Sequence, residues 1–217
     1  MKLIAFAWSR PLCVWALSLA GAAPACADGA GRLVLRDDFS DVSSGWVDRA
    51  ASRDSDQGFA VYTDSGQYQM TPVQDDTYGV VSAPRQAGPD IEVAADLFLY
   101  AGIGRGAGGV ACRIQDPKNF YAFIARGDGG IVIVRVRDGH ATALAEGRVD
   151  QVMAGAVETR ISARCSGTDL ALSASGSPTL TARDSTHVHG AAGLLVLGET
   201  LAGTSASFDN FELRATD

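Results

Sequence analysis

The sequence lacks any long segment with a helical apolar repeat: beyond residue 27, apolar residues do not recur at a 3.6-residue spacing. It also lacks charge runs, low-complexity tracts and internal repeats, which would indicate further domains. No serine or cysteine nucleophile motif and no paired Cys or His spacing of a zinc site is present. These absences argue against a helical fold and give no sign of catalytic machinery.

The N-terminal segment has the pattern of a secretory signal peptide. Lys2 and Arg10 are basic, the stretch from Leu12 to Ala23 is almost wholly apolar, and Ala25-Cys26-Ala27 fits a small-x-small cleavage site. The apolar run is shorter than the roughly 20 residues of a membrane-spanning helix. We therefore expect a signal peptide at 1–27 and one domain at 28–217, with no membrane span after cleavage.

The alternative for this segment is a lipoprotein acylated at Cys26. The residues before Cys26, Ala23-Pro24-Ala25, lack the Leu that such signals usually carry. Cleavage after Ala27 is thus favoured, and the domain is expected in the periplasm or outside the cell.

The balance of charge is acidic. The chain has 18 basic and 25 acidic residues, and removal of Lys2 and Arg10 with the signal takes the net charge from −7 to −9. Such a surface argues against binding of nucleic acid or anionic membrane through bulk electrostatics. It does not identify a partner.

Short apolar runs separated by Gly, Asp, Ser and Pro fill the rest of the chain. Ile91, Val93, Ala95, Leu97 and Leu99 alternate with polar residues, the period of a half-buried strand. Further strands are expected at 33–35, 59–63, 68–70, 109–115, 119–125, 130–136, 141–145, 159–165, 170–173, 194–197 and 206–213. About a dozen short strands in one domain predict an all-β, antiparallel two-sheet sandwich or jelly roll.

Two cysteines remain after the signal. Cys112 and Cys165 both fall on the apolar phase of their strands. In an exported domain the simplest expectation is one disulfide, which we predict to cross adjacent strands. Two buried free thiols are the alternative.

Several motifs resemble the concanavalin A-like lectin/glucanase jelly roll of bacterial secreted proteins. From Gly109 to Val136 the chain combines Cys-Arg, Asn-Phe-Tyr-x-Phe and Asp-Gly; Asp37-Asp38-Phe39-Ser40-Asp41 with Gly45-Trp46 resembles the opening of these domains, and Phe208-Asp209-Asn210-Phe211 resembles their closing strand. The group includes laminin-G-like modules and the keto-disaccharide-hydrolase-type domain. The resemblance implies a jelly roll whose closing strand pairs near the first.

The resemblance leaves three functions open. The one favoured is an exported glycan-binding or interaction module, because the fold motifs are complete and no catalytic residues can be named. The alternatives are a glycan-acting hydrolase of the keto-disaccharide type and a structural envelope protein. The partner expected is a polysaccharide or cell-envelope glycan. The strand acids Glu92 and Asp96 lie about 13 Å apart, too far for a glycosidase pair.

Candidate ligand residues lie on the two strands around the Asp116 to Lys118 turn. Arg113 is expected on the outward phase of its strand, near Phe120 or Tyr121 on the next. Arginine offers planar donors to sugar hydroxyls or carboxylates, and an aromatic ring can stack on a pyranose. The alternative for Arg113 is an ion pair with Glu92 or Asp96.

A structural calcium ion is the only cofactor indicated. If the first and last strands pair, Asp38, Asp41 and Asp209 come together with backbone carbonyls, and calcium prefers several oxygen ligands. The alternative is that Asp41 and Asp209 only cap turns.

Overall fold

Alternation of apolar residues builds the strands, as β5 (Ile91–Tyr100) illustrates. Ile91, Val93 and Leu97 are buried, whereas Glu92 and Asp96 between them are partly exposed. The computed structural model describes residues 31–49, 59–72, 78–100, 106–149, 157–174, 179–198 and 205–216, so the predicted signal peptide at 1–27 lies outside the described residues.

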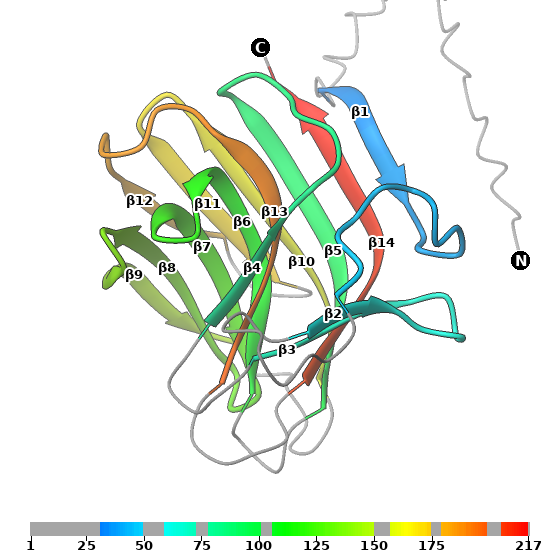
Figure 1. Cartoon of the computed structure of the whole chain (residues 1–217). Helices are drawn as coiled ribbons and strands as arrows, with labels where there is room; N and C mark the ends of the chain where they lie inside the picture. Colours follow the sequence, from blue (N-terminus) through cyan, green and yellow to red (C-terminus); the bar gives the residue numbers. More distant parts are fainter. Residues whose placement is uncertain are drawn as a thin grey trace, which may run out of the picture.

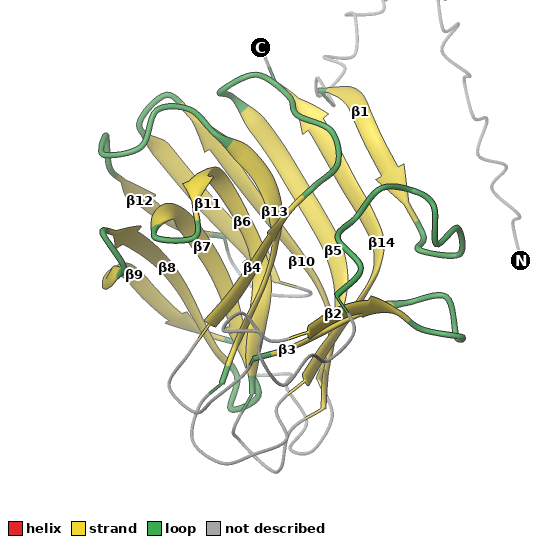
Figure 2. Ribbon diagram, in the orientation of Figure 1, coloured by secondary structure: helices red, strands yellow, loops and turns green. Residues whose placement is uncertain are grey.

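Strands make up the regular structure of these ranges, and Figure 2 shows no helix within them. The other strands are β1 (Arg32–Asp37), β2 (Phe59–Tyr62), β3 (Tyr68–Thr71), β4 (Tyr78–Ser82), β6 (Ala107–Asp116), β7 (Asn119–Arg126), β8 (Gly130–Arg137), β9 (His140–Arg148), β10 (Val157–Ser166), β11 (Asp169–Ala174), β12 (Leu180–Arg183), β13 (Ala191–Leu197) and β14 (Ser205–Ala215).

The strands form two antiparallel sheets that pack face to face (Figure 1). The eight-stranded sheet has the order β12-β11-β10-β5-β14-β3-β2, with β1 also paired to β14. The six-stranded sheet has the order β4-β13-β6-β7-β8-β9. This confirms the predicted all-β jelly-roll sandwich and the pairing of the closing strand with the first.

Two strands were missed by the sequence prediction. β4 and β12 are short edge strands, and each pairs with a single neighbour, β13 or β11. Edge strands have one exposed side and few residues, so their apolar alternation is too brief to stand out. β12 forms one wall of a surface groove.

The opening and closing motifs meet in an aromatic cluster. The Trp46 ring lies 4.8 Å from that of Phe211 and 5.4 Å from that of Phe39. The Trp46 indole Nε1 donates to Asp37 Oδ2 at 2.9 Å. Trp46 is 4% exposed, so it serves the core and offers no surface for sugar stacking.

The six-stranded sheet is apolar on both of its faces. Residues such as Val110, Phe123 and Ile133 point into the space between the sheets, and Ala111, Ala122 and Ile124 form a second buried cluster. These two sets alternate along the strands, which places the second cluster on the opposite face of the sheet.

A disulfide joins the two sheets. Cys112 of β6 is bonded to Cys165 of β10, with their Cα atoms 6.8 Å apart. The predicted pairing is therefore confirmed. The predicted placement on adjacent strands is wrong, because β6 and β10 belong to different sheets and the bridge crosses the core.

Loss of this bridge should destabilise the domain. Its sequence separation of 53 corresponds to about 4 kcal/mol in the chain-entropy model. We expect a lower denaturant midpoint for Cys112→Ala/Cys165→Ala than for the oxidised parent. The reduced parent is the matched control, since it loses the bond but keeps both sulfur atoms. Detection of two free thiols by peptide mapping of the exported protein would contradict the assignment.

Candidate functional site

Arg113 is buried rather than directed outward. The residue is 1% exposed, and its backbone φ of 53° departs from the extended conformation of a strand. The pairing of β6 with β7 shifts register between Cys112 and Asp116, as in a β-bulge. The bulge breaks the alternation on which the prediction depended, so the expectation that Arg113 faces solvent is wrong.

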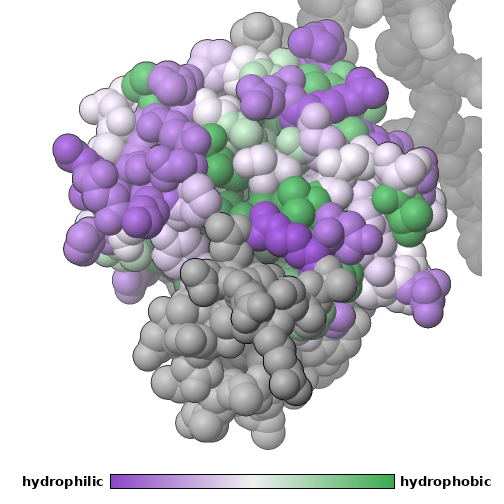
Figure 3. Space-filling view, in the orientation of Figure 1, coloured by the Kyte–Doolittle hydropathy of each residue, from purple (hydrophilic) through white to green (hydrophobic). Residues whose placement is uncertain are grey.

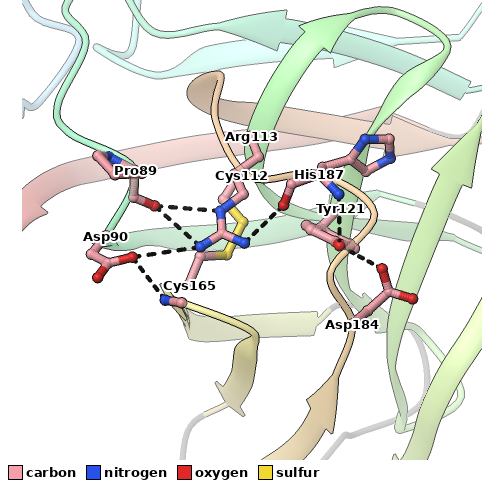
Figure 4. The surroundings of a disulfide bond; sticks show 9 residues. Pro89, Asp90, Cys112, Arg113, Tyr121, Cys165, Asp184 and His187 are labelled. Atoms are coloured by element: carbon pink, nitrogen blue, oxygen red, sulfur yellow. Dashed lines mark hydrogen bonds and ion pairs between the residues drawn. A yellow bond between two sulfur atoms is a disulfide. The ribbon is translucent and has the colours of Figure 1, made fainter.

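The Arg113 guanidinium links three segments of backbone (Figure 4). Nη1 donates to the His187 carbonyl at 2.8 Å, and Nε and Nη2 each lie 3.4 Å from the Pro89 carbonyl oxygen. Nη2 is also 3.6 Å from Asp90 Oδ1, which accepts a hydrogen bond from the Gly167 amide. The ion-pair partner is thus Asp90, not the Glu92 or Asp96 suggested by the sequence.

Glycine at position 190 allows this packing. Gly190 has a φ of 139°, and a Cβ atom there would lie 2.4 Å from the Arg113 carbonyl carbon. A side chain would therefore collide with the bulge. The segment from Asp184 to Gly190 is held close against Arg113 as a result.

Tyr121 anchors the same segment from inside the sandwich. Its hydroxyl donates to Asp184 Oδ1 at 2.6 Å and accepts from the His187 amide at 3.0 Å. Burial and the hydrogen bond to Asp184 raise the pKa of Tyr121, so it remains a donor. Phe120, on the other face of β7, is 0% exposed and packs edge-on against Tyr78. Neither predicted aromatic ligand residue offers an exposed face.

Asp184 accepts hydrogen bonds from Tyr121, Arg135 and the Thr186 amide. Burial alone would raise its pKa, but hydrogen bonds from Tyr121 and Thr186 and the Arg135 charge outweigh burial and lower the pKa to about 2. Arg135 Nη1 lies 2.9 Å from Asp184 Oδ2. His187 completes the arrangement: its Nε2 donates to the Val136 carbonyl at 2.8 Å.

Beside this network lies a small cavity, which we call the hairpin pocket. It has a volume of about 300 Å³ and is lined by Gln115, Asn119, Arg137, Thr186 and His187. The Asn119 amide is already engaged by Asp116 and by the Asp138 backbone amide. The side chain of Gln115 makes no hydrogen bond to any residue in the described ranges, and so its amide is open to a ligand.

A larger cavity, the β10–β12 groove, lies on the outer face of the eight-stranded sheet. It has a volume of about 690 Å³ and is lined by Arg164, Ser166, Asp169, Leu170, Ala171, Thr181, Ala182 and Arg183. In Figure 3, hydrophilic residues gather on the left side of the molecule, where Figure 1 places β9 and β12. Neither cavity was predicted from the sequence.

The three predicted calcium ligands mostly serve their own turns. Asp38 Oδ1 accepts from the backbone and hydroxyl of Ser40, and Asp41 Oδ1 does the same with Ser43. Asp209 Oδ1 accepts from the next backbone amide, that of residue 210. Within the described ranges, no group of three or more His, Cys, Asp or Glu is placed to hold a metal ion.

Two carboxylates nevertheless lie side by side on the outer face of the eight-stranded sheet. Asp96 and Asp209 are cross-strand partners at a register shift between β5 and β14. Burial, together with the negative charges of Asp96 and Asp38, raises the pKa of Asp209. Asp96 is engaged by Arg160 at 3.0 Å and by the Asn210 amide at 2.8 Å.

Comparison with known proteins shows the fold. No protein-family model matches the sequence, and no curated protein matches it. Among solved structures, the carbohydrate-binding module CBM66 from Bacillus subtilis is 20% identical with a TM-score of 0.62, over 79% of this chain and 96% of that one.

Two other solved structures have the same architecture. The Bacillus licheniformis β-glucanase is 8% identical with a TM-score of 0.54, over 87% of this chain and all of that one. The VIP36 exoplasmic/lumenal domain is 14% identical with a TM-score of 0.52, over 74% of this chain and 82% of that one. The domain therefore has the concanavalin A-like jelly-roll fold. No helix of the described ranges has the length and apolarity to cross a membrane.

The Asp184 network should make stability depend on acid pH. Because folding lowers this pKa from 3.8 to about 2, the carboxylate stabilises the domain above pH 4, and that contribution falls away as the pH drops toward 2. At pH 7, Asp184→Asn should cost about 2 kcal/mol of unfolding free energy. Urea unfolding of both proteins across this pH range measures the difference.

The matched control is Asp169→Asn, which removes an exposed carboxylate paired with Arg183. Exposed pairs contribute little, so this variant should behave like the parent. Equal acid sensitivity of the parent and Asp184→Asn would contradict the role given to Asp184.

Proposed function

We propose that this protein is an exported, non-catalytic glycan-binding module that recognises a polysaccharide or cell-envelope glycan. The observation that carries the proposal is the hairpin pocket, where the amide of Gln115 and the guanidinium of Arg137 stand beside the hydroxyl of Thr186. Sugar hydroxyls both donate and accept hydrogen bonds, and this set supplies both functions. The disulfide is consistent with export.

The pocket is suited to binding because its wall is fixed before a ligand arrives. Thr186 and His187 belong to the segment held by Arg113, Tyr121 and Asp184. A rigid site loses little conformational entropy when it binds. The volume of about 300 Å³ is at the lower end for ligand pockets and suits one sugar unit, such as a chain end.

Recognition at this site would be polar rather than aromatic. The large apolar side chains that are exposed in the described ranges are Leu33, Val42, Val47 and Val188, all aliphatic. Without a stacking ring, hydrogen bonds must supply most of the affinity, so weak binding is expected for a single sugar. The similarity to a carbohydrate-binding module and to a domain solved with Man3GlcNAc supports a glycan as the ligand.

The pair formed by Asp96 and Asp209 favours a second candidate, a glycan hydrolase. Glycosidases use one protonated and one ionised carboxyl group, and the raised pKa of Asp209 fits the first role. Asp96 is already engaged by Arg160 and Asn210, which speaks for a structural role. Release of reducing ends from a bound glycan, abolished by Asp209→Asn, would establish the hydrolase instead.

Glycan binding can be tested with an array followed by calorimetry on the oxidised protein. For a glycan that binds, Gln115→Ala and Arg137→Ala should each weaken affinity roughly threefold to tenfold, the effect of one or two hydrogen bonds.

Arg148→Ala is the matched control. Arg148 is an exposed arginine of β9. Its strand partner is Gly130 at the start of β8, whereas Arg137 lies at the end of β8, so the two arginines are at opposite ends of the β8–β9 hairpin. Its removal changes net charge equally but should leave affinity unchanged. The proposal fails if no glycan of the array binds, or if the pocket variants bind as well as Arg148→Ala.

A further inference from the structure

The strands β10, β11 and β12 lie side by side at one edge of the eight-stranded sheet (Figure 1). The lining residues of the β10–β12 groove form two rows across these three strands. In the first row, Arg164 pairs with Ala171 and Ala171 with Thr181; in the second, Ser166 pairs with Asp169. Asp169 in turn pairs with Arg183. Cross-strand partners on one face lie close together, so each row forms a continuous band across the sheet.

The first row is hollow at its centre. Ala171 carries only a methyl group between the long side chain of Arg164 and that of Thr181. This small side chain leaves space between them, and Leu170 and Ala182 contribute to the lining. The resulting volume of about 690 Å³ lies within the usual range for ligand sites.

The polar side chains of this groove are available to a ligand. Arg164 is exposed, and neither it nor Ser166 nor Thr181 makes a side-chain hydrogen bond or ion pair with any residue of the described ranges. Other arginines of this sheet are engaged: Arg160 binds Asp96, and Arg214 binds Glu212. Arg164 makes no such ion pair within these ranges, and the carboxylate nearest to it across the sheet is that of its strand partner Glu92 on β5.

The lining of the groove contains two arginines, Arg164 and Arg183, and one carboxylate, that of Asp169. Arg183 forms an exposed ion pair with Asp169 at 2.7 Å, so Arg164 is the arginine of the lining whose guanidinium has no ion pair with another lining residue. A guanidinium binds a carboxylate through two parallel hydrogen bonds, an interaction stronger than that with neutral hydroxyls. No aromatic residue lines the groove, so a neutral sugar would lack a stacking surface there.

We propose that the β10–β12 groove is a second carbohydrate site, specific for a sugar that carries a carboxylate, such as a uronic acid residue. Arg164 binds the carboxylate, and Ser166 and Thr181 bind ring hydroxyls. The site is separate from the hairpin pocket, and its ligand is anionic. The inference rests on the proposed glycan-binding function and adds acidic sugars as a second class of ligand.

The test uses the oxidised protein with three polyuronates as probes: polygalacturonate, alginate and hyaluronan. Neutral galactan is the comparison ligand. At least one polyuronate should bind in calorimetry at low salt, and binding should weaken as salt rises. Arg164→Ala should lower that affinity roughly tenfold to a hundredfold, as expected for loss of a charge-assisted contact.

Arg160→Ala is the charge-matched control. Arg160 lies on the same strand and face, about 13 Å from Arg164, and is already paired with Asp96. It should leave polyuronate affinity unchanged. Arg164→Lys, which keeps the charge but not the planar fork, should restore only part of the affinity.

The inference is overturned if none of the three polyuronates binds, or if Arg160→Ala weakens binding as much as Arg164→Ala. These outcomes are distinct from failure of the hairpin pocket. Loss of neutral-glycan binding in Arg137→Ala, with polyuronate binding intact, would support both sites independently.

Discussion

The covalent link between the two sheets, together with the arginine beside it, determines how this end of the sandwich is built. The Cys112–Cys165 bond holds β6 against β10 across the core. At the next residue, the bulge turns Arg113 inward, where its charge is met by Asp90 and by two backbone carbonyls. A buried cation without these partners would be costly, so the surrounding loops must keep their positions.

The buried Arg113 also fixes the position of the segment before β13. The His187 carbonyl binds Arg113, its amide binds Tyr121, and its ring binds the Val136 carbonyl. Three contacts in different directions fix one residue of the wall of the hairpin pocket. The pocket is therefore shaped by buried groups that never touch a ligand, which explains why Arg113 and Tyr121 belong to the neighbourhood of the site without belonging to its surface.

The sequence predicted the fold better than the site. Alternation in β5 and the turn residues were enough to predict a sandwich, and the apolar phase of Cys112 and Cys165 predicted their pairing. Alternation failed at Arg113, because a bulge leaves no signature in residue types alone. Arg164 lies between the inward-facing Ala163 and Cys165, so alternation alone indicates that Arg164 faces outward. Its neighbours Ala171 and Thr181 on the next two strands follow from strand register, which a single sequence does not supply.

We propose that the preformed polar pocket at the β6–β7 end binds a glycan. Amide chemical-shift mapping with a neutral oligosaccharide that binds tests it most directly. We expect perturbed signals at Gln115, Arg137, Thr186 and His187, with small shifts elsewhere, since buried hydrogen bonds hold the wall in place. Perturbations centred on Asp96 and Asp209, with this end of the sandwich unchanged, would contradict it.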